Sequence, residues 1–338
     1  MPNQLKPNHE PIGLALAGLR TWGRNHLRVF SHLEQARIRY IFDEDPRQTA
    51  QQVKANPRLT VAADFRQILQ DDQVRAVVLC TPAQQHFEMG RAALEAGKDL
   101  LIEKPLTTNA EQAEALCRLA EQNQRILQVS HLMLFHPAVD HLKKLIDSGE
   151  LGELYYLYSQ RLNLGLLRSE EDSLWSLAPH DLALVNDLLG AQPRHVQASG
   201  GCSLKKGIKD VIFIHLSYSD GQIVNIHVSW LDPRKTRRLT VVGSKKMAVF
   251  DDMAATEKIR LYDKGVSRVE RGDFGEVLSV RTGDIVIPNI PNQEPLRRQA
   301  IHFLDCLARR KQPKVTGRHG LAVVRTLEAA QRQLARTS

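Results

Sequence analysis

Short apolar runs alternate with amphipathic stretches along the first part of the chain. The stretches between the runs carry helix signals, such as Asn109, which suits a helix N-cap, and Gly97, which suits a helix C-terminus. This alternation is typical of βαβ units and predicts a parallel, doubly wound sheet of the Rossmann type. The expected strands are Ile12–Ala17, Ile38–Phe42, Ala76–Cys80, Leu100–Ile102 and Ile126–Val129.

The pattern changes near residue 150. A bridging helix over residues 137–148 is expected to end at the Ser148–Gly152 break, and a hairpin signal follows at Asp220-Gly221. Helices over Pro179–Leu189 and from Pro295 to the end would cover one face of a mostly antiparallel, open sheet. The fold class is therefore α/β, with a Rossmann domain over residues 1–130 and an α+β domain over residues 150–338. The expected strands of the second domain are Leu154–Arg161, His195–Ser199, Val211–Tyr218, Ile223–Trp230, Leu239–Val242 and Met247–Phe250.

The composition fits a soluble globular protein. Of the 338 residues, 42% are hydrophobic and 25% are charged, and no run is long enough to span a bilayer. The four cysteines lack CxxC spacing, which predicts a reducing, cytoplasmic setting without a bound metal. The net charge of +8 indicates an affinity for anions. Because no nucleic-acid-binding motif accompanies it, we interpret the basic residues as solvated surface and expect no nucleic-acid partner.

A glycine-containing turn follows the first expected strand. Gly18 suits the tight turn of a GxGxxG loop, and Gly23 suits the close packing of strand and helix. Arg20 stands at the middle position, where glycine lets the backbone approach a pyrophosphate, so its side chain either disturbs the phosphate geometry or swings out to contact phosphate. The loop, with Thr21 and Trp22, predicts a dinucleotide site; the alternative is an ordinary turn between strand and helix.

Two further strand ends strengthen the dinucleotide interpretation. Asp43 follows the second strand, 20 residues after Gly23, where a carboxylate accepts hydrogen bonds from the adenosine ribose and repels a 2′-phosphate. NAD is thus favoured over NADP; alternatively, Asp43 only starts the turn at residues 43–46. Thr81 and Pro82 follow the strand at Ala76–Cys80, where Thr81 either contacts the cofactor or caps the next helix.

The strand at Leu100–Ile102 ends in Glu103-Lys104-Pro105. A lysine at the carboxyl end of a parallel strand projects toward the ligand crevice, although it is alternatively a surface lysine before a turn. With the Gly18 loop, Thr81-Pro82, His86 and the Ser148–Glu153 turn, this tripeptide resembles the signature of the glucose-fructose oxidoreductase/inositol dehydrogenase (GFO/IDH/MocA) family. The resemblance implies an NAD cofactor and a lysine, Lys104, that touches both the nicotinamide ribose and the substrate hydroxyl. It also implies that Glu103 and His86 belong to the cofactor site.

The family's acid/base histidine corresponds to His180. Pro179 suits the first position of a helix, so His180 is expected in the first helical turn, where the helix dipole keeps imidazole neutral. Many relatives carry an aspartate four residues before this histidine, but this chain has Ser176. Either that relay is dispensable, or Asp181 assists the histidine. The alternative to a catalytic His180 is a histidine that caps a buried helix.

The stretches at residues 161–165 and 227–233 resemble a branch associated with lipid A and surface-polysaccharide biosynthesis. That branch implies NAD-dependent oxidation of the 3-hydroxyl of a UDP-linked N-acetylated sugar, such as UDP-N-acetylglucosamine, to a ketone that a PLP aminotransferase consumes. The corresponding glucuronic acid derivative, or another sugar or polyol, stays open as the substrate. Arg161 and Asn163 are expected to hold the sugar or a phosphate, and His131 either lines the nicotinamide pocket or is a core histidine.

The resemblance also implies a homo-oligomer, a dimer or tetramer, formed through the open face of the second sheet. A different class of function stays open, a catalytically silent NAD-sensing regulatory protein. The departures at Arg20 and Ser176 favour it, whereas retention of Lys104 and His180 favours an enzyme.

Overall fold

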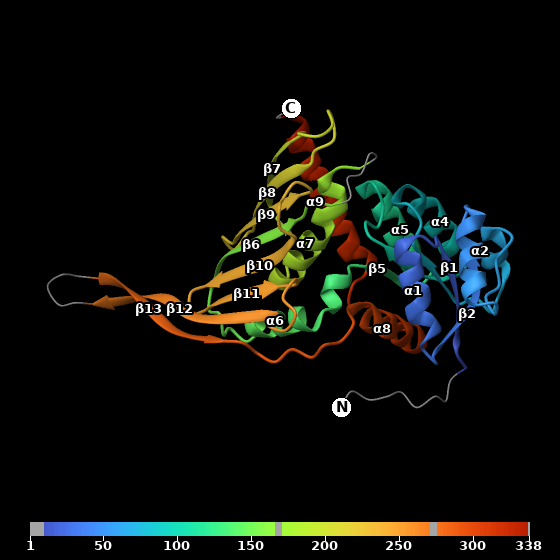
Figure 1. The fold of residues 1–338 in the computed structure, drawn as a ribbon, viewed down its shortest axis with the longest axis horizontal. Helices are drawn as coiled ribbons and strands as arrows, with labels where there is room; N and C mark the ends of the chain where they lie inside the picture. The colour runs from blue at the N-terminus through green and yellow to red at the C-terminus, as the bar shows by residue number, and fades with distance from the viewer. Residues whose placement is uncertain (1–9, 166–170, 271–275, 337–338) are drawn as a thin grey trace. The chain divides into compact units, whose positions relative to one another are not determined.

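The computed structural model describes residues 10–165, 171–270 and 276–336. By their internal contacts these residues form two compact units (Figure 1). The first unit takes the chain up to Leu132 together with Glu294–Arg325, and the second takes Met133–Gln293 and the chain from Thr326.

The first unit is built on a five-stranded parallel sheet in the order β2-β1-β3-β4-β5. All residues of β1, β3, β4 and β5 are buried, as expected for a parallel sheet covered on both faces. The expected helix signals are confirmed, since Asn109 Oδ1 accepts the N–H of Gln112 and Gly97 takes a positive φ of 73°. The strands are β1 (Ile12–Ala17), β2 (Ala36–Phe42), β3 (Ala76–Leu79), β4 (Asp99–Glu103) and β5 (Leu127–Ser130).

Helices accompany this sheet, and some of them come from the far end of the chain, where the first part of α9 (Gly317–Arg336) also belongs to this unit. The first five are α1 (Thr21–Ser31), α2 (Pro46–Ala55), α3 (Phe65–Gln70), α4 (Ala83–Glu95) and α5 (Ala110–Gln122). The helix α8 (Pro295–Arg309) packs against α1, where Phe303 and Leu307 join Phe30 in one buried cluster. The expected boundary, which gave all of residues 150–338 to the second domain, differs from this division because α8 buries its apolar face in the first unit.

The second unit holds an eight-stranded sheet in the order β13-β12-β11-β10-β6-β9-β8-β7. Its neighbouring strands are antiparallel except β6 and β9, which run parallel. The strands are β6 (Leu154–Leu162), β7 (His195–Gly201), β8 (Val211–Ser217), β9 (Ile223–Ser229), β10 (Thr236–Gly243), β11 (Met247–Asp251), β12 (Ile259–Glu270) and β13 (Glu276–Val286). The α/β fold class, with a parallel sheet followed by a mostly antiparallel one, is confirmed.

One face of the second sheet is covered and the other is open. The helix α7 (Ser173–Leu189) contacts β6, β8 and β9 on the covered face. The opposite face exposes Tyr156 and Tyr158 of β6, Phe213 of β8 and Ile223 of β9. The bridging helix is confirmed as α6 (Pro137–Asp147), preceded by the 3₁₀ turn η1 (Leu132–Phe135), and α9 (Gly317–Arg336) ends in this unit.

The long β12–β13 hairpin was not predicted from the sequence. It extends past the other strands of its sheet (Figure 1) and exposes Val266, Leu278 and Val280. Charged, polar and glycine residues interrupt its apolar positions, so no long apolar run marks it.

Candidate active site

The glycine loop has the conformation that its sequence predicts. Gly18 has φ +87°, and a Cβ there would lie 2.5 Å from the carbonyl carbon of Cys80. A Cβ on Gly23 would lie 1.7 Å from the Gly18 carbonyl oxygen, so α1 can approach β1 only with glycine at this position. Arg20 has φ −70° and ψ −160°, which any residue adopts, and its side chain is exposed. The loop therefore accommodates the arginine without backbone strain.

A cavity of about 440 Å³ lies beside this loop, at the carboxyl ends of β1, β2 and β3. Asp43 lines it, and its Oδ2 accepts the N–H of Leu19 at 2.6 Å while its Oδ1 accepts the N–H of Asp45 at 2.9 Å. The carboxylate thus both starts the turn and fixes the glycine loop at the cavity wall. The lining residues are Gly18, Arg20, Phe42, Asp43, Glu44, Asp45, Pro46, Arg47, Cys80, Thr81, Pro82, Gln85 and Met89.

The cavity wall carries features that fit a bound nucleotide. Thr81 Oγ1 is buried and has no hydrogen-bond partner among the described residues, so a ligand oxygen there would satisfy it. The exposed residues Thr21 and Trp22 begin α1, whose first N–H groups suit an anion. These observations fit the expected NAD, and the contact of Asp43 with a ribose stays a prediction.

Glu103, which is expected to belong to the cofactor site, is the centre of a buried hydrogen-bond network. Its Oε1 lies 2.9 Å from His26 Nε2 and accepts the hydroxyl of Ser130 at 2.8 Å. Burial opposes ionisation of this carboxyl, but the interactions with His26, Ser130 and Lys104 outweigh it and hold its pKa below the usual value. Sequence reasoning missed His26, although it stands three residues after Gly23, because its partner lies 77 positions away.

His86 is also a buried residue, and it contacts the backbone of two loops. It is 1% exposed, and its ring nitrogens lie 2.9 Å from the carbonyl oxygens of Thr81 and Pro105. Burial lowers its pKa. His86 therefore links the loop after β3 to the loop after β4, and any effect on the cofactor passes through these loops.

His131 has the environment of a ligand-binding histidine. It is 1% exposed, and both of its ring nitrogens are buried without a hydrogen-bond partner among the described residues. Burial, aided by the charge of Lys104, lowers its pKa to about 3, so the ring is neutral at physiological pH. A neutral imidazole without a partner needs a donor or acceptor from a ligand or water.

His180 does not lie in a first helical turn, and the expectation about it was wrong. The helix α7 begins at Ser173, after Asp172 caps it by accepting the N–H of Trp175, so Pro179 lies inside the helix. Proline there removes one helical hydrogen bond without ending the helix, because packing of α7 on the sheet maintains it. The N-terminal dipole acts within the first turn, so it does not account for a neutral His180.

The residues around His180 are tied to the sheet. Asp181 is 2% exposed, and its Oδ2 accepts Arg161 Nε at 2.6 Å while its Oδ1 accepts the Ser159 hydroxyl at 2.7 Å. The Asp181 carboxylate is thus held by Arg161 and Ser159, and the suggestion that it also assists His180 stays a prediction. Arg161, at 7% exposure, is held by Asp181 and does not have the open position expected of a substrate ligand. Asn163, half-buried, follows the end of β6.

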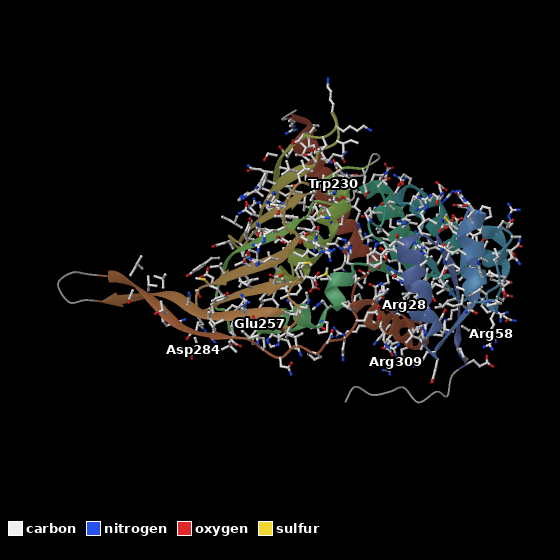
Figure 2. The ribbon with its side chains drawn as sticks, in the orientation of Figure 1. Arg28, Arg58, Trp230, Glu257, Asp284 and Arg309 are labelled. Carbon is white, nitrogen blue, oxygen red and sulfur yellow. The ribbon has the colours of Figure 1, made fainter. Side chains whose placement is uncertain are left out.

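Ser176 has a defined contact in place of the relatives' aspartate. Trp230 Nε1 donates to Ser176 Oγ at 3.2 Å, and both residues are buried (Figure 2 labels Trp230). The structure thus gives Ser176 a packing role on α7. Lys104 belongs to the first unit and His180 to the second, so their pairing is part of the proposal below.

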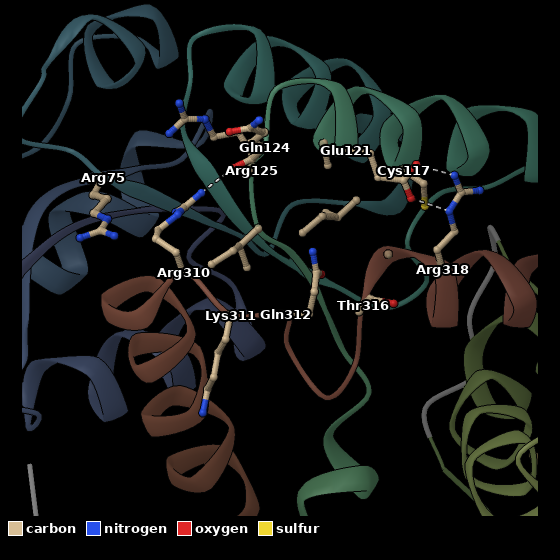
Figure 3. Close-up of a pocket in the computed structure, with 14 residues that line it drawn as sticks. Arg75, Cys117, Glu121, Gln124, Arg125, Arg310, Lys311, Gln312, Thr316 and Arg318 are labelled. Carbon is tan, nitrogen blue, oxygen red and sulfur yellow. Dashed lines mark hydrogen bonds and ion pairs between the residues drawn. The ribbon is translucent and has the colours of Figure 1, made fainter.

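A second hollow of the first unit lies away from this site, at the amino ends of β3 and β5 (Figure 3). It is lined by several arginines, of which Arg310 pairs with Asp99 and Arg318 with Glu121. Arg28, on the surface of α1, is likewise paired with Glu294. Ligands of open α/β sheets bind at the carboxyl ends, so the cavity at Gly18 is the candidate site.

In the part of the chain that the structure describes, no helix is long and apolar enough to cross a membrane. Within the same residues, no group of three or more histidine, cysteine, aspartate or glutamate side chains is arranged to hold a metal ion.

Two family models match the chain. The model of the oxidoreductase family NAD-binding Rossmann fold covers residues 12–131, and that of the GFO/IDH/MocA C-terminal domain covers residues 139–249. UDP-N-acetylglucosamine 3-dehydrogenase of Acidithiobacillus ferrooxidans is 28% identical over 253 residues, 75% of this chain and 77% of that protein. Inositol 2-dehydrogenase 2 of Saccharopolyspora erythraea is 26% identical over 228 residues, 64% of this chain and 66% of that protein.

Solved structures agree with this assignment. The UDP-N-acetylglucosamine 3-dehydrogenase GnnA from A. ferrooxidans has a TM-score of 0.80 at 25% identity, covering 96% of this chain and 98% of its own. GenD2 from gentamicin A biosynthesis, solved in complex with NAD, shares the fold with a TM-score of 0.83 at 22% identity, covering 100% and 98%. The chain therefore belongs to the GFO/IDH/MocA family, as an NAD-dependent oxidoreductase of the kind that acts on sugars and polyols.

Proposed function

We propose that this protein oxidises the 3-hydroxyl of a UDP-linked N-acetylated sugar, UDP-N-acetylglucosamine, to the 3-ketone with NAD. The similarity to the A. ferrooxidans dehydrogenase over three quarters of the chain carries this proposal. Lys104, directly after the buried strand β4, and His180 on α7 support it, since these residue types suit alcohol oxidation.

The reaction removes a proton from the hydroxyl oxygen and a hydride from the carbon that bears it. NAD, when bound, accepts the hydride. His180 accepts the hydroxyl proton, because histidine changes charge closest to neutral pH. Lys104 donates a hydrogen bond to the substrate oxygen and stabilises the negative charge that develops there. His131, neutral and buried, supplies a further hydrogen bond to the substrate or cofactor next to Lys104.

Two alternatives concern the substrate. A UDP-N-acetylglucosaminuronate would need a further cation for its carboxylate, and Arg161 does not offer one because it pairs with Asp181. A free polyol is the second alternative, which the similarity to an inositol 2-dehydrogenase favours. Asn163 after β6 stays a proposed substrate contact, whereas Arg161 is proposed to act by holding Asp181 and α7 in place.

The cellular role follows from the same proposal. The 3-ketone would serve a PLP aminotransferase in lipid A or surface-polysaccharide biosynthesis, in the cytoplasm. A homo-oligomer would bury the open sheet face that exposes Tyr156, Phe213 and Ile223. Such an exposed apolar patch is typical of an interface between protein chains.

The test is NADH formation, followed by absorbance, with purified protein, NAD and a panel of UDP-sugars and inositol. A coupled aminotransferase with glutamate draws off an unfavourable ketone. We expect NADH with UDP-N-acetylglucosamine and loss of turnover, but not of NAD binding, in Lys104→Ala and His180→Ala. The exposed residues Lys54 and His195 provide matched alanine controls, which should keep activity.

The panel also separates the classes of function. NADH with inositol alone would replace the proposed substrate with a polyol. NAD binding without turnover of any substrate would favour the silent NAD-sensing protein. Full activity in either the Lys104 or the His180 variant would remove that residue from the mechanism.

A further inference from the structure

The strand β4, which Lys104 directly follows, ends in a buried carboxylate. Glu103 is 8% exposed, and around it lie His26 of α1 at 0% and Ser130 of β5 at 2%. The fourth member is Gln299 of α8, at 0% exposure, whose Nε2 donates to the Ser130 hydroxyl at 3.0 Å. The network thus joins β4, α1, β5 and α8, with Gln299 linked to Glu103 through Ser130.

The network ends on the main chain of Lys104. Glu103 Oε1 interacts with His26 and Ser130, while its Oε2 accepts the backbone N–H of Lys104 at 3.2 Å. Because the carboxylate is ionised, His26 Nε2 carries the hydrogen of their contact. His26 is also held from behind, where its ring stacks on Phe30 at a centroid distance of 6.1 Å. The carboxylate thus has little freedom to turn away from Lys104.

We propose that His26 and Glu103 are positioning residues for Lys104: the buried carboxylate fixes the lysine main chain and keeps a negative charge behind its ammonium group. This inference rests on the proposed role of Lys104 in catalysis. Ser130 and Gln299 support the pair from β5 and α8.

The electrostatic part of the proposal has two sides. The Glu103 carboxylate favours the charged form of Lys104, whose ammonium group in turn stabilises the carboxylate. His131 also interacts with Lys104, but burial keeps it neutral, so it adds no opposing charge.

A second buried carboxylate, Asp99 at the other end of β4, provides a control for substitutions of Glu103. Asp99 is 0% exposed, its Oδ1 accepts the N–H of Ile126 at 2.7 Å and its Oδ2 pairs with Arg310 at 2.6 Å. Asp99 is thus a buried, ion-paired carboxylate of the same strand, four residues from Glu103 and away from Lys104. Asp99→Asn should destabilise the fold without changing the pH response of Lys104.

Two pairs of variants separate geometry from folding. In Glu103→Gln one carboxylate oxygen is replaced by an amide N–H₂ group, which cannot accept a hydrogen bond. That group faces either the backbone N–H of Lys104 or His26 Nε2, and the donor that it faces loses its acceptor. His26→Phe keeps the ring stack but removes the donor, whereas His26→Gln keeps a donor near the position of Nε2. We expect kcat to fall about 10²-fold in Glu103→Gln and about 10-fold in His26→Phe, with recovery in His26→Gln and little change in KM.

The deciding measurement does not require turnover. The rate at which an amine reagent labels Lys104, followed by mass spectrometry of the full-length protein, is recorded against pH in each variant. Loss of the Glu103 charge should move the midpoint for Lys104 to lower pH in Glu103→Gln, and not in Asp99→Asn. Unfolding temperatures and NAD affinities check that each variant is folded.

The outcomes are distinct. An unchanged labelling midpoint in Glu103→Gln, or an equal shift in Asp99→Asn, would overturn the positioning role. If the midpoint moves but no sugar or polyol supports turnover of the wild type, the positioning pair stands and the proposed function fails. If Glu103→Gln does not fold, the same comparison is made between His26→Phe and His26→Gln, where only the former should lower kcat and alter the labelling profile.

Discussion

Replacing Arg161 by methionine should destabilise the second unit. The change removes a guanidinium that donates to Asp181 at 2.6 and 3.3 Å and leaves that carboxylate, 2% exposed, with the Ser159 hydroxyl. Methionine retains much of the apolar length of arginine, so the loss is mainly one of charge. Because removing one partner of a buried ion pair leaves the other without compensation, the expected cost is about 3–5 kcal/mol.

This cost is large enough to measure by calorimetry. For a unit of this size, each kcal/mol lowers the unfolding temperature by about 2–4 °C, so a decrease of about 10 °C is expected for Arg161→Met. The double variant Arg161→Met/Asp181→Leu should recover most of it, because an apolar pair replaces the buried charges. The exposed pair Arg260–Glu257 provides the control, and Arg260→Met should cost below about 1 kcal/mol.

The same variants decide between two roles of Arg161. An internal partner predicts a large loss of stability and recovery in the double variant. A substrate ligand predicts a normal unfolding temperature with a raised KM for the sugar. The expected decrease in unfolding temperature is large. If Arg161→Met unfolds within about 2 °C of the wild type, the reasoning is refuted.

Three further predictions concern the first unit. Asp43→Ala should weaken the binding of NAD and reduce the preference for NAD over NADP. If the ratio of the NAD and NADP dissociation constants is unchanged, Asp43 is a turn residue only. Gly18→Ala should raise the NAD dissociation constant at least about tenfold, because its Cβ meets Cys80, whereas Gly149→Ala, also at positive φ but in open space, should not. The pKa of His131 is lowered to about 3 in the folded protein. Below about pH 6.5, His131 therefore binds a proton in the unfolded chain but stays neutral in the folded one. Between pH 6.5 and 5, the free energy of unfolding should therefore fall by about 2 kcal/mol more in the wild type than in His131→Phe. Urea unfolding at the two pH values measures both changes, and equal changes in the two proteins would contradict this.

Local patterns were sufficient for the parallel sheet and the glycine loop. The strand β1 was predicted with its observed bounds because all six of its residues are apolar or small and are buried. Gly18 and Gly23 were recognisable because the requirement for glycine arises within a few residues of the chain. Asn109 and Gly97 likewise act on their own helices.

Other features depend on contacts that sequence patterns do not contain. The start of α7 was misplaced because Pro179 resembles a first helical residue, whereas the cap is Asp172. The β12–β13 hairpin was missed because the described residues of β13, from Leu278 to Val286, are exposed, so no buried apolar face marks that strand. The buried partners Glu103 and His26, or Arg161 and Asp181, come from different elements, so no spacing rule brings them together.

The position of Ser176 bears on how the proposed oxidation can work. A carboxylate there, as in many relatives, would lie at a site that is 7% exposed and would face the indole N–H of Trp230. Serine accepts that hydrogen bond without bringing a charge into the interior, which removes the desolvation cost of an aspartate. The nearby carboxylate of Asp181 already accepts hydrogen bonds from Arg161 and Ser159. Because Ser176 brings no carboxylate, the relay that the family resemblance implies lacks that member, and the proposed mechanism assigns the hydroxyl proton to His180.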